Sequence, residues 1–540
     1  MTSIIVHINN NYYKITAVLF RSVDNSLYLK FVPNTRGPLT DKMITLILIV
    51  AVVALLAAIY LRGVYNEAYW KKRGVKFYQK SRALGIFFEF FKGDRSVLEH
   101  IEDIYCEFRN EPAVGVGSLF SPNLIVTDPT NVQHLTTVDF NSFMDRSIAP
   151  NSRDTLSNSL IFITGAKWKL IRQSMTPLFT SSKLKSMYYI MDKSAKDFVP
   201  YIKTNPKLKK GNAFNTLCTF CSAAMGAAVF GVTTESVFDS PFLKMAQKAG
   251  VTTFWQNLKF VISISSSFIT RLFNVKLAAE HEAFFIGAIK QIIMERKKSN
   301  VKRHDFGDLC VALQEKGVLR DNETGLEIKP TDEILSAQAF FFFNAGVEPT
   351  ATTIFNFFVL VGQHPEVQER LHREVDEAFK KSQGNLTFDI ISDMEYLEMV
   401  LNESMRIYPA IGFFGRMCVK NTTLPVGNIK IDKGTTIFLP LFALQHDERY
   451  YPEPEVFKPE RFSKENKDPI IDKTFMPFGK GNRMCIGQRF ATVQAKAGIV
   501  HLMRHFKVNT VQISGKKIES PLVSGVAYYG YTVSGHYKRF

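Results

Sequence analysis

The stretch FMPFGKGNRMCIGQRF, residues 475–490, sets a single cysteine in a glycine-rich loop that leads into a helix. Its glycines Gly479, Gly481 and Gly487 permit a tight turn and let a flat cofactor approach the backbone. A thiolate is the form of cysteine that binds metals, and it is favoured where backbone N–H groups and a helix N-terminus face the sulfur. Cys485 has these surroundings, so the stretch predicts a metal ligand.

The number of possible ligands near Cys485 limits the kind of metal site to which it can belong. One thiolate with no neighbouring cysteine or histidine cannot complete a zinc or iron–sulfur site, whereas one axial protein ligand is sufficient for haem. Arg483 precedes Cys485 by two residues, where its guanidinium can pair with an anionic group on the cofactor. A buried structural cysteine is the better interpretation of Cys485 in isolation, and the surrounding pattern argues against it.

The pattern Phe478-x-x-Gly481-x-Arg483-x-Cys485-x-Gly487 resembles the haem-binding loop of the cytochrome P450 family. Five positions occur in the family's order, close to the C-terminus where the family has them. The resemblance implies haem b (iron protoporphyrin IX) with Cys485 as the axial thiolate. It also implies that Phe478, Arg483 and Gly487 belong to the cofactor-binding site.

Two further segments extend the resemblance. LNESMRIYP contains Glu403-x-x-Arg406, and PEPEVFKPERF contains Arg461. In the family these three charges form a buried network under the haem-binding loop, so their expected role here is structural. A lone E-x-x-R is usually a solvated i, i+3 pair and carries weight only beside Arg461 and Cys485. Removing one partner would leave an unpaired buried charge, which costs about 3–5 kcal/mol.

Residues 165–187, GAKWKLIRQSMTPLFTSSKLKSM, resemble the helix that contacts haem in this family. Trp168 and Arg172 are four residues apart and share one helix face, so the indole N–H and the guanidinium are both expected to reach a propionate. Arg146, in FMDRS, matches a third propionate contact. Arg416 is a weaker candidate.

Residues 43–61, MITLILIVAVVALLAAIYL, carry no charge. At 1.5 Å per residue they span about 28 Å, enough to cross a bilayer core. The run is too long for the apolar region of a cleaved signal peptide. Lysines and arginines crowd its C-terminal flank, which predicts that the following residues face the cytosol. With the resemblance to microsomal family members, this implies a single-pass anchor in the endoplasmic reticulum membrane.

The remaining chain divides around this anchor. Residues 1–42 are polar and are expected to be irregular; because the apolar run begins at Met43, we expect Met43 to be the natural start and the preceding residues to be absent from the native protein. Residues 62–80 predict a basic linker. Residues 81–540 lack internal repeats and low-complexity blocks, which predicts one haem-thiolate catalytic domain.

The fold class follows from the distribution of helical and strand-like patterns in the catalytic domain. Long helical patterns fill its middle, and short strand-like pieces such as GTTIFLP at 434–440 lie nearer its ends. The sequence therefore predicts a mainly α, α+β domain with small β-sheets, which is the cytochrome P450 fold that the resemblance implies. The longest helical pattern, residues 330–365, is apolar nearly all round and predicts a helix through the centre of the domain.

Composition limits the partners. A net charge of +17 predicts an acidic partner surface or anionic lipid. The sequence has no Lys/Arg run with interleaved aromatic residues, the pattern that would indicate nucleic-acid binding. Six scattered cysteines are too few for a disulfide framework in 540 residues. The resemblance implies NADPH-cytochrome P450 reductase, cytochrome b5, membrane lipid and an apolar small molecule as partners.

The central helix departs from the family at one position. The family shows Ala-Gly-x-acid-Thr, whereas residues 345–350 read AGVEPT, so that Pro349 replaces the usual threonine. Proline lacks the N–H that would bond the Ala345 carbonyl, and the helix is expected to be interrupted there. Proton delivery to oxygen is the family function that this change affects.

Three functions remain open from the sequence. The preferred one is a monooxygenase resembling arthropod-type detoxifying members. It would insert one oxygen atom of dioxygen into xenobiotics or endogenous lipids, with NADPH as the electron source through the reductase, Thr350 in the hydroxyl role and Glu348 as the acid. The second is a haem-thiolate enzyme that rearranges or dehydrates peroxides without a reductase, favoured by Pro349. The third is a haem or hydrophobic-ligand binder without turnover, which would not need the thiolate Cys485.

Overall fold

The structure is a computed structural model in which two compact units, residues 1–62 and 63–540, are defined. The residues it describes are 4–10, 13–21, 27–33, 38–80, 82–87, 96–119, 121–148, 151, 153–205, 213–231, 238, 244, 254–265, 267–299, 302–466, 468–517 and 529–537.

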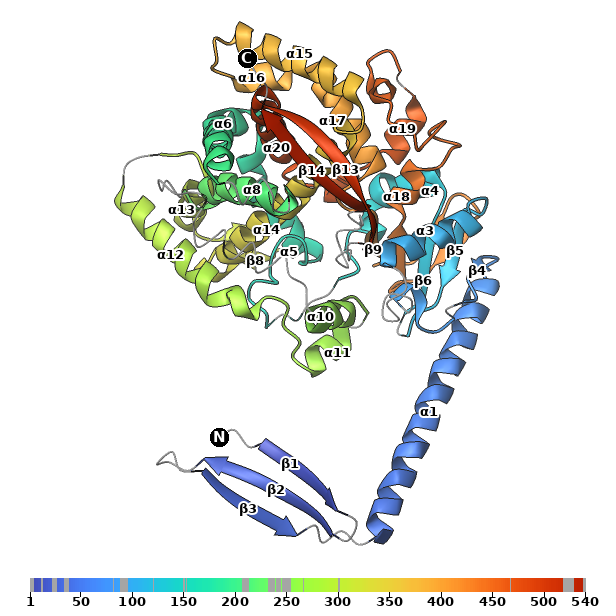
Figure 1. The fold of residues 1–540 in the computed structure, drawn as a ribbon. Coiled ribbons are helices and arrows are strands. Elements are labelled where there is room, and N and C mark those ends of the chain that lie inside the picture. Colours follow the sequence, from blue (N-terminus) through green and yellow to red (C-terminus); the bar gives the residue numbers. More distant parts are fainter. Residues whose placement is uncertain are drawn as a thin grey trace. The chain divides into compact units, whose positions relative to one another are not determined.

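The first unit begins with a three-stranded antiparallel sheet. Its strands are β1 (Ile4–Asn10), β2 (Tyr13–Arg21) and β3 (Leu27–Pro33), in the order β1-β2-β3 (Figure 1). The irregular segment expected over residues 1–42 is therefore corrected. The strands IIVHINN, YKITAVLFR and LYLKFVP are rich in β-branched and aromatic residues, which favour extended backbone.

Helix α1 (Pro38–Lys71) contains the apolar run and crosses from the first unit into the second. Two helical segments of the described chain are long and apolar enough to cross a membrane, Met43–Lys71 and Ala213–Phe230. The most apolar window of the first is not buried at all, whereas 67% of the corresponding window of the second is buried inside the catalytic unit. The second is thus a core helix by its packing.

Of the segment expected as a linker, residues 62–80, all but Arg62 belong to the second unit. The last turns of α1 bury Asn66 and Trp70, and the Asn66 amide donates to the carbonyl oxygens of Arg82 (3.0 Å) and Ser118 (2.9 Å). The indole of Trp70 lies against Gly115, where a Cβ atom would collide with it. This packing explains why the segment does not behave as a linker.

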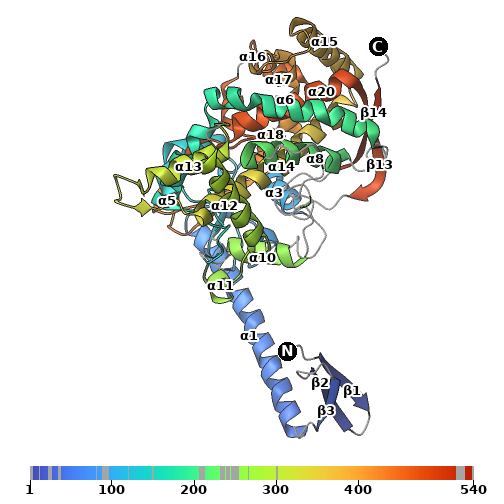
Figure 2. The same cartoon turned by 90° about the vertical axis from the view of Figure 1, so that its left-hand side faces the viewer.

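The second unit is mainly helical with small sheets, as the sequence predicts (Figures 1 and 2). Its helices are α3 (Val97–Glu107), α4 (Pro129–Gln133), α5 (Gly165–Met175), α6 (Ser181–Thr204), α8 (Ala213–Phe230), α10 (Phe254–Ser265), α11 (Ser267–Leu272), α12 (Glu282–Lys298), α13 (Phe306–Lys316), α14 (Asp332–Val361), α15 (Pro365–Lys381), α16 (Phe388–Ser392), α17 (Glu395–Ile407), α18 (Leu441–Gln445), α19 (Pro469–Thr474) and α20 (Gln488–His505).

A five-stranded sheet flanks the helices in the order β4-β5-β6-β12-β9. Its strands are β4 (Lys76–Phe77), β5 (Ala113–Val116), β6 (Asn123–Val126), β9 (Phe414–Met417) and β12 (Thr436–Leu439). Three two-stranded antiparallel sheets complete the unit: β7 (Leu319–Arg320) with β8 (Glu327–Ile328), β10 (Thr422–Leu424) with β11 (Ile429–Ile431), and β13 (Phe506–Lys517) with β14 (Tyr529–Tyr537).

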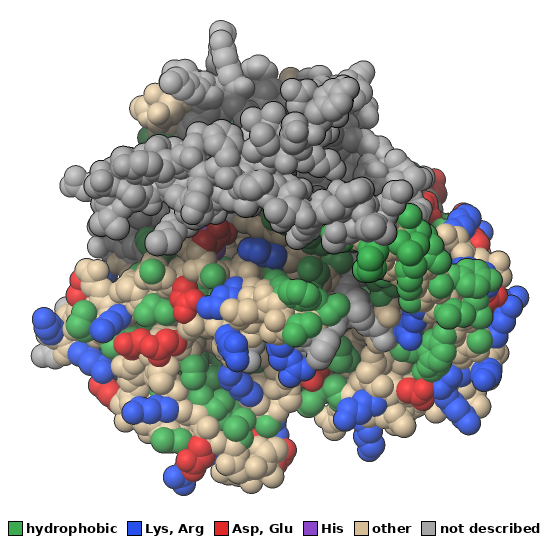
Figure 3. All heavy atoms as spheres, turned by 90° about the horizontal axis from the view of Figure 1, so that it is seen from below, with side chains coloured by type: hydrophobic (Ala, Val, Ile, Leu, Met, Phe, Trp, Pro, Cys, Tyr) green, Lys and Arg blue, Asp and Glu red, His purple; other side chains and the backbone are tan. Residues whose placement is uncertain are grey.

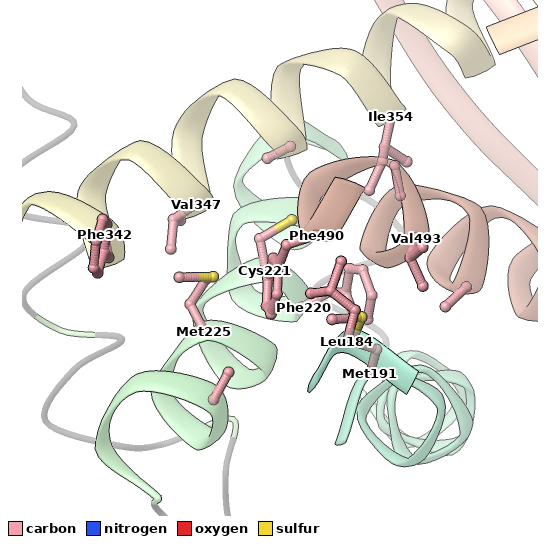
Figure 4. Packing of buried hydrophobic residues seen from close by; sticks show 14 of the residues in the cluster. Leu184, Met191, Phe220, Cys221, Met225, Phe342, Val347, Ile354, Phe490 and Val493 are labelled. Atoms are coloured by element: carbon pink, nitrogen blue, oxygen red, sulfur yellow. The ribbon is translucent and has the colours of Figure 1, made fainter. Parts of the chain in front are cut away.

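Helix α14 lies at the centre of the main hydrophobic core and contacts α8, α12, α17 and α20. In Figure 4, Phe342 and Val347 of α14 lie above Met225 and Cys221 of α8. The helix begins where the Thr331 hydroxyl accepts the N–H of Ile334. Almost every residue of its second half is buried, as its apolar sequence predicts.

The interruption expected at Pro349 is corrected, because α14 is helical from Asp332 to Val361 with Pro349 inside it. A proline removes one N–H from the hydrogen-bond ladder, and the neighbouring bonds on either side can hold the helix together. In addition, the Thr353 hydroxyl donates to the Pro349 carbonyl oxygen at 2.9 Å. The proline therefore removes a donor from α14 without ending it.

Candidate active site

The cysteine loop is closed by its own backbone. The N–H of Cys485 donates to the Phe478 carbonyl (2.8 Å), and that of Met484 donates to the Gly481 carbonyl (2.9 Å). Gly481 has a φ of 69°, and a Cβ atom there would collide with the carbonyl oxygen of Thr136. Glycine is required at this position because both the left-handed backbone and the close approach exclude a side chain. Helix α20 then begins at Gln488.

A cavity of about 330 Å³ lies against this loop. Its wall is mostly apolar and combines the loop with α5, α8, α14 and β9, so that segments far apart in the sequence meet there. Cys485, Phe478, Arg483 and Gly487 from the loop all line it. Burial raises the pKa of the Cys485 thiol, whereas the Gly487 N–H and the cations Arg146 and Arg172 act in the opposite direction.

Four arginines, Arg146, Arg172, Arg416 and Arg483, line the same cavity. In the described chain, Asp145 is the acid that forms an ion pair with this cluster, at 3.5 Å from Arg483. Burial, and next the repulsion from Arg146, lower the pKa of Arg416 to about 9 and that of Arg483 to about 8. The Nε atoms of Arg146 and Arg416 are buried and have no hydrogen-bond partner. A cavity with this excess of cations requires an anionic ligand.

Arg483 is held rigidly at the edge of this cluster. Its guanidinium donates to the carbonyl oxygens of Met144 (2.7 Å) and Ile163 (3.1 Å). It also lies 4.0 Å from the centre of the Trp168 ring, a cation–π contact. Trp168 itself lines the cavity beside Arg172, one turn further along α5. The two residues that the sequence places on one helix face therefore both reach the cavity.

The structure brings Glu403, Arg406 and Arg461 together away from the cavity wall. Arg406 makes two hydrogen bonds to the Glu403 carboxylate (2.8 and 2.9 Å), and Arg461 makes one at 3.2 Å. Neither Glu403 nor Arg406 has any exposed surface. Arg406 also donates to the carbonyl oxygens of Gln445 (2.9 Å) and Pro454 (2.7 Å), so this network ties α17 to the segments after it.

Comparison with known proteins identifies this arrangement. The family model for cytochrome P450 matches residues 81–527. The chain belongs to the cytochrome P450 family. Its similarity to cytochrome P450 6k1 of Blattella germanica is 30% identity over 477 residues, which covers 85% of this chain and 91% of the relative.

Two other relatives give the same result for this cytochrome P450. Cytochrome P450 9e2 of Blattella germanica is 31% identical over 483 residues, covering 84% of this chain and 90% of the relative. Cytochrome P450 6a2 of Drosophila melanogaster is 32% identical over 510 residues, covering 91% and 98%. The resemblance to arthropod members is thus confirmed, and the chain is an oxidoreductase of the monooxygenase type that uses haem with a cysteine thiolate ligand.

The residues of the cavity fit haem. Cys485 is the cysteine among the cavity-lining residues, and one thiolate is the ligand that haem needs from this side. The two orphaned Nε atoms of Arg146 and Arg416 are donors of the charge and geometry that carboxylate groups such as propionates accept. The excess of positive charge therefore matches the two carboxylates of the cofactor.

Of the two proposed proton-transfer residues on α14 of this P450, one lines the cavity and the other does not. Thr350 is 4% exposed and lines the cavity together with Pro349 and Ala345. Glu348 is not a cavity-lining residue. Its charge acts on Cys218 of α8, where burial and then the charge of Glu348 raise the pKa of that thiol to about 12.

Arg416 is the cavity residue that sequence patterns place least well. It lies on β9, and the N–H of the next residue, Met417, donates to the Asp145 carbonyl at 2.8 Å. This hydrogen bond places Arg416 beside Arg146, although the two residues are 270 positions apart in the sequence. Only the pairing of β9 with β12 and with the segment at Asp145 determines this neighbourhood. No local motif encodes it.

Proposed function

We propose that this P450 is a membrane-anchored monooxygenase that inserts one oxygen atom of dioxygen into apolar small molecules, either xenobiotics or endogenous lipids. Electrons would come from NADPH through a reductase. The observation that carries the proposal is one cavity lined by Cys485, by four arginines that have Asp145 as their acidic partner among the described residues, and by a largely apolar wall. Haem bound there supplies the activation of dioxygen.

Each group of residues has its own task. The Cys485 sulfur would be the axial ligand, and Arg146, Arg172 and Arg416 would hold the propionates. Arg483 and Trp168 hold the wall in place through the contacts at Met144 and Ile163. The network of Glu403, Arg406 and Arg461 has no cavity contact and would keep the fold in register.

The rest of the wall defines the substrate class. Phe341, Phe413 and Phe414 line the cavity, and the charged side chains of its lining are those of the arginine cluster. Apolar walls with few polar groups select ligands by shape and exclude water. We therefore assign uncharged, apolar molecules as substrates.

Thr350 is the best candidate for the hydroxyl that moves a proton towards the reacting oxygen. The other threonine on this wall, Thr353, donates its proton to the Pro349 carbonyl oxygen. Pro349 also leaves the Ala345 carbonyl without its usual helical donor, and Ala345 faces the cavity, so a water can bind there. Glu348 would act as the acid from behind this wall.

The chain's location and its protein partners are inferred from α1 and from net charge. Residues 43–61 would form the single-pass anchor in the endoplasmic reticulum membrane, with the catalytic unit in the cytosol. A net charge of +17 suits acidic electron donors, NADPH-cytochrome P450 reductase and cytochrome b5. On the face seen from below, Lys and Arg are interspersed with Asp, Glu and hydrophobic side chains (Figure 3).

The haem ligand is tested by spectroscopy of reduced protein with carbon monoxide. The unaltered protein is expected to show the Soret band typical of a thiolate ligand, and Cys485→Ser is expected to lose it. Cys310→Ser, at a buried cysteine of α13 outside the cavity, is the matched control and should keep it. An unchanged band in Cys485→Ser would overturn the assignment.

A second assay separates monooxygenation from peroxide rearrangement. Product is expected with NADPH and reductase and to depend on both. Turnover of a lipid hydroperoxide in the absence of reductase, with none from NADPH, would instead support the peroxide isomerase or dehydratase. Reduced, dioxygen-binding protein that oxidises no apolar compound would support the binder without turnover.

A further inference from the structure

The segment of residues 153–163 forms one side of the cavity. Leu160 and Ile161 line the cavity directly. On the cofactor side, Arg483 donates to the Leu160 carbonyl oxygen at 3.4 Å, in addition to its bond with Ile163. The position of this wall is therefore fixed at its C-terminal end by the same arginine that belongs to the cysteine loop.

Helix α14 holds the middle of the segment. The Gln338 side chain accepts the N–H of Leu160 at 2.8 Å and donates to the Asn158 carbonyl at 3.0 Å. Gln338 has no exposed surface. A buried amide that uses both its carbonyl and its NH₂ group on one segment fixes that segment against the helix.

The N-terminal part of the segment is tied to the connection between α11 and α12 (Figure 1). One carboxylate oxygen of Asp154 accepts the backbone N–H of Leu277 (2.6 Å) and that of Ala278 (3.2 Å). The same oxygen accepts the hydroxyl of Ser157 at 2.7 Å. We call the two bonds from Asp154 to Leu277 and Ala278 the Asp154 clasp.

Two side-chain pairs support the clasp. The Asn151 amide donates to the Asn274 side-chain oxygen at 2.7 Å, and the Thr155 hydroxyl donates to the Glu282 carboxylate. Asn274 has a φ of 46°, a left-handed backbone that asparagine tolerates better than most residues. The two segments thus meet through three consecutive polar contacts.

Asp154 is an unusual residue to find in this place. It has no exposed surface, and its second carboxylate oxygen has no hydrogen-bond partner. Among the described residues, no cation forms an ion pair with it. Burying a carboxylate that is not fully hydrogen-bonded destabilises a fold relative to an apolar residue of similar size. A contribution to stability alone is therefore a poor explanation of Asp154.

We propose that Asp154 is a positioning residue that holds the cavity wall at 153–163 against the segment 274–282. The clasp sets how far this wall can move from the cavity, and thereby how large a ligand enters and how well water is excluded. The proposal rests on the proposed use of the cavity for apolar ligands. It adds a residue that does not line the cavity and that no motif of the loop or of α14 indicates.

The first test measures the clasp itself in the full-length haem-loaded protein. Asp154→Asn keeps the size of the side chain and replaces its charge, which weakens the bonds to the two backbone N–H groups. Hydrogen–deuterium exchange of a peptide containing Leu277 and Ala278 is expected to become roughly tenfold faster. Ser157→Ala removes the local bond to the same oxygen and leaves the clasp, so its exchange at these residues should stay near that of the unaltered protein.

The second test measures ligand entry, with imidazole and 4-phenylimidazole as probes that bind haem iron and shift its Soret band. Asp154→Asn is expected to bind the bulky 4-phenylimidazole with an association rate raised roughly tenfold, by the same loss of restraint. Imidazole is small enough to enter with the wall in place, so its rate should stay within about twofold. Both measurements are independent of turnover and remain valid if the enzyme proves not to be a monooxygenase.

The result that overturns the proposal is a haem-loaded Asp154→Asn protein in which neither exchange nor 4-phenylimidazole association changes. Faster exchange with unchanged association would equally overturn the role in ligand entry. If Asp154→Asn fails to fold, Thr155→Val provides the second variant. It removes the hydroxyl that donates to the Glu282 carboxylate, and it should raise both rates in the same direction by a smaller factor.

Discussion

We expect Arg416 to have opposite effects on stability with and without the cofactor. It is 2% exposed, its Nε atom has no partner, and its guanidinium makes a hydrogen bond of 3.2 Å to the Gly415 carbonyl. Burial and the neighbouring Arg146 lower its pKa to about 9, so the folded protein without haem disfavours the charged form. With a propionate in place, the same charge is an attractive partner.

Arg416→Met is therefore expected to stabilise the haem-free protein and to weaken haem binding. The haem-free variant is expected to have a free energy of unfolding about 1–3 kcal/mol higher than the unaltered protein, because an uncompensated buried cation is gone. The haem-loaded variant should release haem faster, measured by transfer to an acceptor protein. A variant that is less stable in both forms would show that Arg416 has enough partners without the cofactor.

A second prediction separates the two threonines of the α14 wall. Thr350→Ala is expected to lower the fraction of NADPH electrons that reach product, with excess hydrogen peroxide, because it removes the proposed proton-transfer hydroxyl. Thr350→Ser should restore most of the coupling. Thr353→Val is the control, since that hydroxyl already donates to the Pro349 carbonyl oxygen, and it should leave the coupling unchanged. Equal coupling in all three variants would remove Thr350 from the mechanism.

Sequence patterns predict the positions of some site residues better than those of others. Cys485, Phe478 and Arg483 lie within one short loop, so local spacing already puts them together. The position of Glu348 in AGVEPT predicts it as the acid, yet a helix turns by about 100° per residue, so neighbours of a cavity residue point elsewhere. In the structure Thr350 lines the cavity and Glu348 does not. A motif specifies the order of residues and not the cavity into which they point.

At the scale of elements, α14 tests what an internal proline does. Pro349 removes one backbone donor from the middle of a buried helix, and proline at such positions costs about 3 kcal/mol relative to alanine. Because the helix continues through it, we expect this strain to remain in the folded protein. The Ala345 carbonyl, on a residue that lines the cavity, loses its usual helical donor to the proline, and this is the feature that the proline creates.

The prediction for Pro349→Ala has two parts. The melting temperature should rise, because the missing hydrogen bond is restored, and coupling of NADPH oxidation to product should fall, because the carbonyl is no longer free to hold water. Pro200→Ala is the control, since Pro200 lies exposed inside α6. It should raise the melting temperature without changing the coupling. Unchanged coupling in Pro349→Ala would show that the Ala345 carbonyl has no part in proton delivery.

The sequence predicts the central helix of the fold but not the pairing of its short strands. The apolar sequence of residues 330–365 predicts the central helix, and its first residues predict the Thr331 cap. The short strands of the five-stranded sheet are different, because β12 pairs with β6, whose residues lie 313 positions earlier in the chain (Thr436 opposite Asn123), and β9 joins the sheet only through β12. Their pairing depends on tertiary packing, which composition and periodicity do not encode. Arg416 reaches the cavity through that pairing.

For the whole molecule, the division at Arg62 and Gly63 cuts through a continuous helix. Periodicity and charge locate the end of the apolar run, and they do not show which later residues belong to the catalytic unit. Asn66 and Trp70 carry that information through their contacts with Ser118 and Gly115. The last turns of α1 are therefore part of the core, although their sequence resembles a basic flank.

A chain that begins at Gly63 is accordingly expected to remain folded, bind haem and leave the membrane fraction, because it keeps Trp70 and loses the apolar run. Trp70→Ala in that shortened chain should lower the free energy of unfolding by about 3–5 kcal/mol, since the indole has no exposed surface and packs directly on Gly115. Denaturant unfolding followed by the Soret band measures this loss. Tyr65→Ala, at a side chain that is 52% exposed on the same helix, is the control and should change the stability by less than about 1 kcal/mol. If the two variants lost equal stability, the boundary of the catalytic unit would have to lie beyond Trp70, and the buried end of α1 would be a passive extension of the membrane helix.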